Sequence, residues 1–468
     1  MSLNGTTRVF RLAARAKCND LVDVFKYKSE RTGLTVTIAD VESPLVNGCF
    51  CLATEAHDDS GLPHTLEHLV FMGSEKYPYK GVLDLFANRC LASGTNAWTD
   101  TDHTCYTLCT AGSEGFLKLL PVYMDHILYP MLTDAQYATE VHHITGTGED
   151  AGVVYCEMQS HESKASALTY YELKKCLFPP PCGYGVETGG RIASIRQLCS
   201  VDRVREFHRM FYRPENLNVI ISGKLEHEHV FEALEDFEIK IMKKAAESSV
   251  KQNHVRPWSS PVPPFKETIE RHVTCPSDDG LTGLVLVGWH GPAANEWLEE
   301  TALSILLDYL TDTPVAPLER DLIQISDPYC SSISNHVDDQ SVSLVVLTAK
   351  GVPVAKLNLV KDKLFEILRG IGNGKEPFDM KRLGDMIQQQ ILKIYSRLET
   401  APHDVIGSDI IGDFLYGNSD KDFCDRLNQT GLMKELLKKP EKYWRDLLNK
   451  YLLDRKYCLV VRNAAVVT

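Results

Sequence analysis

Residues 64–78 read HTLEHLVFMGSEKYP, and the first five of them predict both a helix and a chemistry. On a helix, positions i and i+4 project from one face about one turn apart, and position i+3 lies beside them. His64 and His68 are therefore expected to point in the same direction, with Glu67 next to them. Apolar residues on the other faces can anchor the helix in a core.

This spacing suits a metal site. Two neutral imidazoles on one helix face can bind a single Zn²⁺ ion, and a neighbouring carboxylate can take a proton from water held at the metal. The chain has 16 histidines and 63 acidic residues. In one chain of this composition, the expected number of such patterns by chance is roughly 0.07. The five residues alone therefore do not exclude chance, and the rest of the sequence must decide.

Composition excludes several classes of protein. The chain has 468 residues, a formal net charge of -13 and 44% hydrophobic residues. Such a chain has enough apolar residues for packed cores, and its acidity disfavours nucleic acid as a partner. Its longest apolar stretches are much shorter than the roughly 20 residues of a membrane span. We therefore expect a globular protein that binds neither nucleic acid nor a membrane.

The cysteines and the first residues bear on the compartment. Fourteen cysteines are scattered along a chain that is large enough to fold without disulfides. With no apolar stretch typical of a secretory signal at the start, reduced thiols and a cytoplasmic location are the first expectation. Residues 1–17 carry arginines at helical intervals and no acidic residue, which also suits a mitochondrial transit peptide. The mitochondrial matrix is therefore the alternative.

Alternating strand and helix patterns run along the whole chain and predict an α+β fold. Residues 243–265 are rich in serine, lysine and proline and poor in large apolar residues, which is typical of a linker. The linker separates residues 1–242 from residues 266–468, where the order of strands and helices is similar. Two related domains are expected.

Several motifs follow one another in an order that resembles a known family. HTLEHLVFMGSEKYP is followed by GTNAWT, DHTCYT, GVVYCEM and GYGVETGG. This series resembles the pitrilysin/insulysin family of zinc metallopeptidases, the inverzincins, whose signature is H-x-x-E-H. The branch close to presequence protease and its uncharacterised eukaryotic relatives is most similar, and the likeness covers about residues 20–461. It implies two homologous domains, each a mainly antiparallel sheet with helices packed on one side, with the zinc site in the first.

The resemblance also assigns roles to residues. His64 and His68 match the zinc-binding histidines, and Glu67 matches the glutamate that activates water. Glu157, in GVVYCEM, matches the third zinc ligand, so that one Zn²⁺ per chain is expected. Glu162, five residues further on, is the alternative third ligand.

Four further residues are expected near the metal. Asn96, Ala97 and Trp98 resemble the family's edge strand, which binds the backbone of a peptide substrate. Without the resemblance, an ordinary strand with a core tryptophan would be the simpler interpretation. Asp150 lies two helical turns before Glu157 and could orient a metal ligand, although a solvated acidic residue beside Glu149 explains it equally well.

The sequence thus predicts a zinc-dependent metalloendopeptidase that hydrolyses peptides or unfolded polypeptide segments. The alternative is a non-catalytic or incomplete member of the same family. Many relatives that this chain resembles are about twice as long and enclose the peptide between two halves. The expected partner is therefore a second copy of the chain or a missing second half, and we expect the isolated monomer to be weakly active at most.

Overall fold

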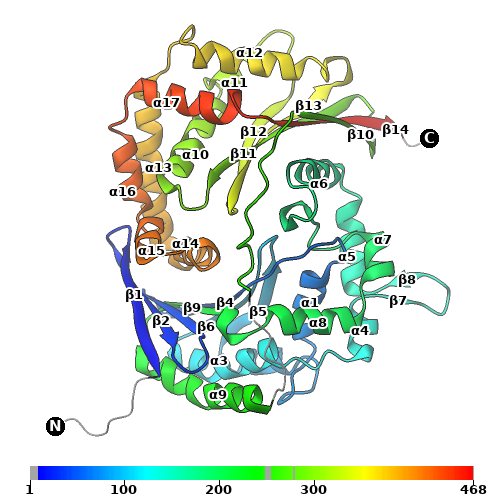
Figure 1. Cartoon of the computed structure of the whole chain (residues 1–468), viewed down its shortest axis with the longest axis vertical. Coiled ribbons are helices and arrows are strands. Elements are labelled where there is room, and N and C mark those ends of the chain that lie inside the picture. The colour runs from blue at the N-terminus through cyan, green and yellow to red at the C-terminus, as the bar shows by residue number, and fades with distance from the viewer. Residues whose placement is uncertain (1–8, 248–254, 278–279, 467–468) are drawn as a thin grey trace. The chain divides into compact units, whose positions relative to one another are not determined.

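The computed structural model describes residues 9–247, 255–277 and 280–466 (Figure 1). Within these ranges, no helix is both long enough and apolar enough to cross a membrane. The chain folds into two compact units, and each is built from three separate segments. Unit 1 comprises residues 1–159, 187–260 and 397–428, and unit 2 comprises residues 160–186, 261–396 and 429–468.

The units therefore differ from the contiguous domains that the sequence indicates. Residues 160–186 precede the expected linker but belong to unit 2, and residues 397–428 follow it but belong to unit 1. Helix α9 continues to Glu247, which is inside the expected linker, and residues 248–254 lie outside the described part of the chain. Beyond them, the Trp258 indole N–H donates to two backbone carbonyls of unit 1, at 2.8 and 3.1 Å, so the end of the expected linker is anchored there.

Unit 1 is built on a seven-stranded sheet in the order β1-β2-β3-β9-β4-β6-β5. All neighbouring strands are antiparallel except the parallel pair β3 and β9. Among the described strands, β5 pairs only with β6 and so forms one edge of the sheet. The strands are β1 (Phe10–Cys18), β2 (Val22–Ser29), β3 (Thr35–Asp40), β4 (Leu45–Ala53), β5 (Ala92–Thr99), β6 (His103–Ala111) and β9 (Leu217–Gly223).

Helices cover the sheet of unit 1, and a large apolar core lies between them and one of its faces. The helices that lie wholly in this unit are α1 (Leu62–Val70), α2 (Val82–Arg89), α3 (Ser113–Leu128), α4 (Asp134–Glu140), α7 (Ile192–Leu198), α8 (Val201–Phe211), α9 (His227–Glu247), α14 (Pro402–Tyr416) and α15 (Asp420–Arg426). Helix α5 (Val153–Glu162) begins in unit 1, and the short strands β7 (His143–Ile144) and β8 (Asp150–Ala151) form a separate pair.

The two faces of this sheet carry different helices, as the alternation along β4 shows. Phe50 stacks on Tyr123 of α3, with their ring centroids 5.2 Å apart. Cys49 points to the other face, where it borders a cavity beneath α14. In Figure 1, α3 and α9 lie below the sheet and α14 lies above it. A helix from near the end of the chain thus covers the face that α3 leaves free.

A partly buried ion pair joins α14 to strand β2. The Lys26 ammonium lies 2.6 Å from the carboxylate of Asp413, which is only 3% exposed. The same ammonium lies 5.2 Å from the ring centroid of Phe423 on α15. These contacts fix the segment of residues 397–428 to a strand almost four hundred positions earlier in the chain.

Replacing Lys26 by methionine should destabilise unit 1 by about 3 kcal/mol, because it leaves the Asp413 carboxylate buried without its cation. Urea unfolding followed by circular dichroism measures the change. The double variant with Asp413→Leu should recover most of the loss, since an apolar pair of similar size replaces the ion pair. A matched control is Lys421→Met, which removes an exposed helical pair with Asp425 and should change little. Equal effects of the two lysine substitutions would contradict the buried-pair account.

Unit 2 holds a five-stranded sheet in the order β10-β14-β11-β13-β12, antiparallel except for the parallel pair β10 and β14. A second apolar core packs between this sheet and its helices. The strands are β10 (Ile269–Ser277), β11 (Thr282–Ala293), β12 (Ser332–Asp338), β13 (Val342–Pro353) and β14 (Cys458–Val466). The helices are α6 (Ala165–Leu177), α10 (Trp297–Thr311), α11 (Pro317–Leu322), α12 (Val360–Gly372), α13 (Met380–Thr400, which ends in unit 1), α16 (Gln429–Leu436) and α17 (Glu441–Leu448).

The predicted fold class is confirmed, since both units are α+β with mainly antiparallel sheets. At the start of the chain, Arg11 and Arg15 lie on strand β1, which pairs with β2 along its length. The mitochondrial alternative for residues 1–17 stays a prediction. Residues 1–8 lie outside the described ranges.

Candidate metal and active site

Helix α1 carries the three residues of the H-x-x-E-H pattern. Its N-cap is Gly61, whose φ of 74° is left-handed, and an added Cβ there would lie 2.6 Å from the backbone oxygen of Gly189. Only glycine fits such a close backbone approach at this dihedral angle. The apolar side of α1 packs into the core of unit 1, so His64 and His68 are presented together on the other side.

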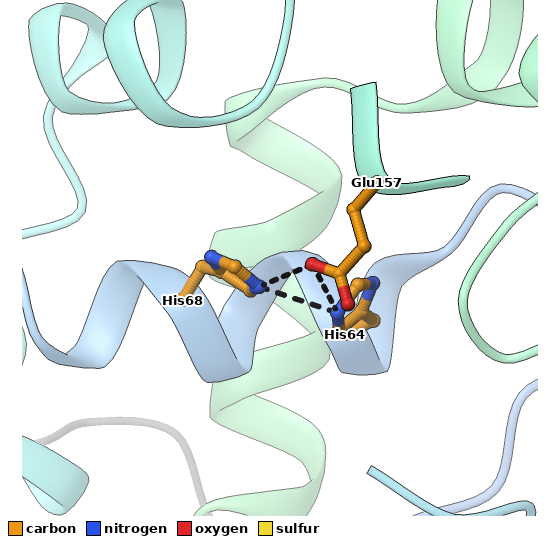
Figure 2. A group of neighbouring side chains, drawn as sticks. All are labelled: His64, His68 and Glu157. Atoms are coloured by element: carbon orange, nitrogen blue, oxygen red, sulfur yellow. Dashed lines mark hydrogen bonds and ion pairs between the residues drawn. The ribbon is translucent and has the colours of Figure 1, made fainter. Parts of the chain in front are cut away.

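Glu157 completes a group of three metal-binding side chains. Val154, Tyr155 and Met158 are buried, and they fix the first turns of α5 in unit 1. The Glu157 side chain is 57% exposed and reaches toward the two imidazoles (Figure 2). One donor atom from each of these three residues lies within 4.8 Å of the others. Glu162 is not a member of this group in the described part of the chain.

The distances test whether this group fits a metal ion. The two Nε2 atoms are 3.2 Å apart, and Glu157 Oε2 lies 3.7 Å from that of His64 and 3.5 Å from that of His68. Ligand atoms about 2.1 Å from a tetrahedral zinc ion would be separated by about 3.4 Å. A His₂Glu set also leaves the fourth position open. The donor types and their spacing therefore fit zinc.

Glu67 lies on the same helix and is almost fully buried. Its Oε2 accepts a 2.6 Å hydrogen bond from the Thr99 hydroxyl at the end of the edge strand β5. Burial raises the pKa of the Glu67 carboxyl above its ordinary value, and the Glu157 carboxylate adds to the rise, whereas the Thr99 hydrogen bond and His68 oppose it. The site thus holds a carboxyl group with increased proton affinity beside the candidate ligands.

A carboxylate orients one of the two histidines. His68 Nδ1 lies 3.2 Å from Glu140 Oε1, and Lys80 Nζ lies 3.2 Å from the other oxygen of Glu140. A histidine ligand usually donates its second ring N–H to such a group, which fixes the ring orientation. Sequence reasoning assigned no role to Glu140, Lys80 or Thr99. Thr99 ends the GTNAWT motif, but no spacing indicates its contact with Glu67, and no motif marks Glu140 or Lys80.

Asp150 has partners other than the candidate ligands. Its carboxylate lies 2.7 Å from His142 Nε2 and forms an ion pair with Arg196. These contacts tie the short β7–β8 pair to α7. Glu140, rather than Asp150, contacts His68.

Asn96, Ala97 and Trp98 lie on the edge strand. Asn96 and Trp98 share the exposed face of β5, whereas Ala97 is partly buried against the core. The Trp98 indole N–H donates to His103 Nε2 at 3.1 Å, and His103 Nδ1 lies 2.6 Å from the Asp102 carboxylate. The edge is thus open for backbone pairing along β5, and its tryptophan is held in place.

The fold and site together define the class of protein to which this chain is similar. Residues 53–167 match the family described as Insulinase (Peptidase family M16), and residues 199–389 match Peptidase M16 inactive domain. The chain belongs to peptidase family M16.

Three known proteins are similar to this chain. An uncharacterised protein of Caenorhabditis elegans is 46% identical over 435 residues, which are 92% of this chain and 43% of that protein. A mitochondrial presequence protease of Gibberella zeae is 27% identical over 359 residues, or 73% of this chain and 34% of that protein. A protease from Helicobacter pylori has the same fold, with a TM-score of 0.73 and 20% identity over 94% of this chain and 100% of the other. The chain thus spans less than half the length of these two curated relatives.

Proposed function

We propose that this chain is a zinc-dependent endopeptidase that hydrolyses peptides or unfolded polypeptide segments. The observation that carries the proposal is the spacing of the His64, His68 and Glu157 donor atoms, at 3.2 to 3.7 Å, beside the buried carboxyl group of Glu67. Membership of peptidase family M16 and similarity to presequence protease support it.

His64, His68 and Glu157 would hold the ion, one per chain. Zinc in such a set supplies Lewis-acid chemistry, since it lowers the pKa of water and polarises a carbonyl group. Glu140 keeps the His68 ring oriented through its contact with Nδ1. The half-exposed Glu157 leaves the site accessible to a substrate from the solvent side.

Glu67 is the general base of this proposal. Its carboxylate takes a proton from the attacking water and then passes that proton to the nitrogen of the leaving amine. The Thr99 hydroxyl holds one oxygen of Glu67, so the carboxyl group keeps a single orientation through both transfers.

The substrate would bind along β5. An extended peptide added to this edge gains main-chain hydrogen bonds that do not depend on its sequence, which gives broad specificity. Because Thr99 on this strand contacts Glu67 directly, a peptide paired with β5 lies close to the base. Asn96 and Trp98 would contact alternate side chains of that peptide.

The proposal is tested by the hydrolysis of an unstructured peptide before chelation, after chelation and after zinc is returned. Hydrolysis should stop and then resume. Since the chain spans 43% of its Caenorhabditis elegans relative, the assay is run on the chain alone and with the second half of that relative added. A zinc-loaded chain that is silent in both assays would contradict the endopeptidase and favour the non-catalytic alternative.

The Glu140 contact gives a prediction for zinc affinity. Glu140→Gln should weaken zinc binding by about 10- to 100-fold, because it removes the charge that orients and strengthens His68. Competition with a chelating dye measures the dissociation constant. Asp150→Asn is the matched control, because Asp150 contacts His142 and Arg196. If Asp150→Asn weakens zinc binding more than Glu140→Gln does, the assignment of Glu140 is wrong.

A further inference from the structure

A cavity of about 550 Å³ lies within unit 1, on the face of the sheet opposite α3. Its floor crosses four strands, from Ser222 on β9, through Cys49 on β4 and Cys109 on β6, to Trp98 on the edge strand β5. Helix α14 forms its roof. The cavity therefore runs from the interior of the sheet to the edge at which we propose that peptides bind. Its volume is within the range of sites for ligands of drug size.

One buried polar group in this cavity lacks a partner. Ser222 is only 6% exposed, and its hydroxyl has no hydrogen-bond partner among the described residues. Buried hydroxyl groups are nearly always paired, and the loss of a partner is costly. Because Ser222 borders the cavity, a ligand with a polar group at this inner end would satisfy it.

Arg397, His403 and Asp404 border the cavity wall. The Arg397 guanidinium forms no ion pair or hydrogen bond within the described part of the chain, so it is available to a carboxylate. The Asp404 carboxylate lies 3.5 Å from His403 Nε2. The first turn of α14 also borders the cavity and has no side-chain cap, and such a helix start attracts negative charge. One cation and one anion thus face the same space.

Gly407, on α14, borders the cavity without a side chain. It lies in the interior of α14, where glycine is destabilising relative to alanine. A Cβ added at Gly407 would have no atom within 4 Å. The position therefore has room for a side chain, and the space that this side chain would occupy belongs to the cavity.

We propose that this cavity binds a short, unblocked peptide of about two or three residues, with its carboxylate at Arg397 and its ammonium group at Asp404. Both ends of such a peptide are charged, which matches the two opposite charges at the wall. Its polar backbone can reach the Ser222 hydroxyl, and its side chains can contact the apolar floor beside Trp98. The ligand class rests on the proposed function, because hydrolysis beside β5 would release such peptides next to the cavity.

Two half-buried thiols report on the occupancy of the cavity. Cys49 and Cys109 line it, and the exposed Cys424 on α15 lies outside it. The full-length Glu67→Gln chain is alkylated with iodoacetamide, and each site is quantified by peptide mass spectrometry. The probe is the tripeptide Ala-Leu-Ala, either unblocked, amidated at its C-terminus or acetylated at its N-terminus. The unblocked form should slow alkylation of Cys49 and Cys109 at least fivefold and leave Cys424 unchanged.

Each blocked form should need about tenfold more peptide for the same protection, because each lacks one charge-assisted contact. Arg397→Gln should weaken protection by the unblocked form but not by the amidated form. Asp404→Asn should weaken protection by the unblocked form but not by the acetylated form. Gly407→Leu should abolish protection by filling the cavity, whereas Gly407→Ala should keep it. If Gly407→Leu does not fold, the Arg397 and Asp404 variants still test whether the cavity binds the two charged ends of the peptide.

Equal protection by all three peptides, or no protection by any of them, would overturn the proposal. The Glu67→Gln background removes the proposed base, so the result does not depend on whether the chain hydrolyses peptides. A protein that protects its thiols but lacks hydrolysis would retain this site while the proposed function fails. If the chain hydrolyses peptides but the tripeptide does not protect its thiols, the proposed function stands and the cavity proposal fails.

Discussion

Replacing Glu67 by glutamine should lower the rate of peptide hydrolysis by roughly a thousandfold while zinc stays bound. Glutamine has nearly the same shape and can still accept the hydrogen bond that Thr99 donates to Glu67. It cannot take a proton from water, so the general-base step is lost. Glu67 is not one of the three candidate metal donors, which is why the metal should remain.

The measurement pairs the turnover rate with the zinc content of the same preparation. Glu162→Gln provides the control, because Glu162 lies on α5 outside the three-residue group. It should keep both activity and metal. If the Glu67 variant retains its turnover, another group must act as the base.

The second large effect concerns metal retention. Glu157→Gln should weaken zinc binding by more than the 10- to 100-fold typical of lost outer-shell partners, because it removes the only anionic donor of the set. The variant should retain little zinc after dialysis against a weak chelator. Elemental analysis of the dialysed protein gives the zinc content per chain.

Glu162→Gln again serves as the matched variant, since it tests the alternative third ligand on the same helix. It should bind zinc as the unaltered chain does. If Glu162→Gln releases zinc and Glu157→Gln does not, the roles of the two residues are reversed. Folding of each variant is checked by circular dichroism so that metal loss is not confused with unfolding.

Local spacing predicts the part of the site that lies on one helix. His64 and His68 share a face because of helical periodicity alone, and the structure brings their Nε2 atoms to 3.2 Å. Glu157 cannot be chosen over Glu162 by periodicity, and the resemblance to zinc metallopeptidases made that choice. The structure brings the Glu157 carboxylate to the two imidazoles, as this choice requires.

The supporting contacts could not be predicted in the same way. Glu140 reaches His68 from α4, and Thr99 reaches Glu67 from β5, so both contacts depend on how separate elements pack. No periodicity within a single element encodes them. Asp150 shows that spacing can also suggest a contact that the fold does not make. Its distance from Glu157 along the sequence suggested a role beside the metal ligands, but its carboxylate pairs with Arg196.

The division of the chain into units was also beyond sequence patterns. The α+β class follows from alternating periodicities, and the structure confirms it. The composition of residues 243–265 indicates a boundary, but it does not reveal that residues 397–428 return to unit 1. That return depends on long-range contacts such as the ion pair between Lys26 and Asp413, which no local pattern announces.

The most direct test of the central claim is an anomalous difference map at the zinc absorption edge, from crystals of the full chain grown with zinc. The account predicts one strong peak per chain, about 2.0–2.2 Å from donor atoms of His64, His68 and Glu157. Glu67 should lie beside the peak without binding to it. A peak at another set of residues, or no peak at this group in a zinc-containing crystal, would contradict the account.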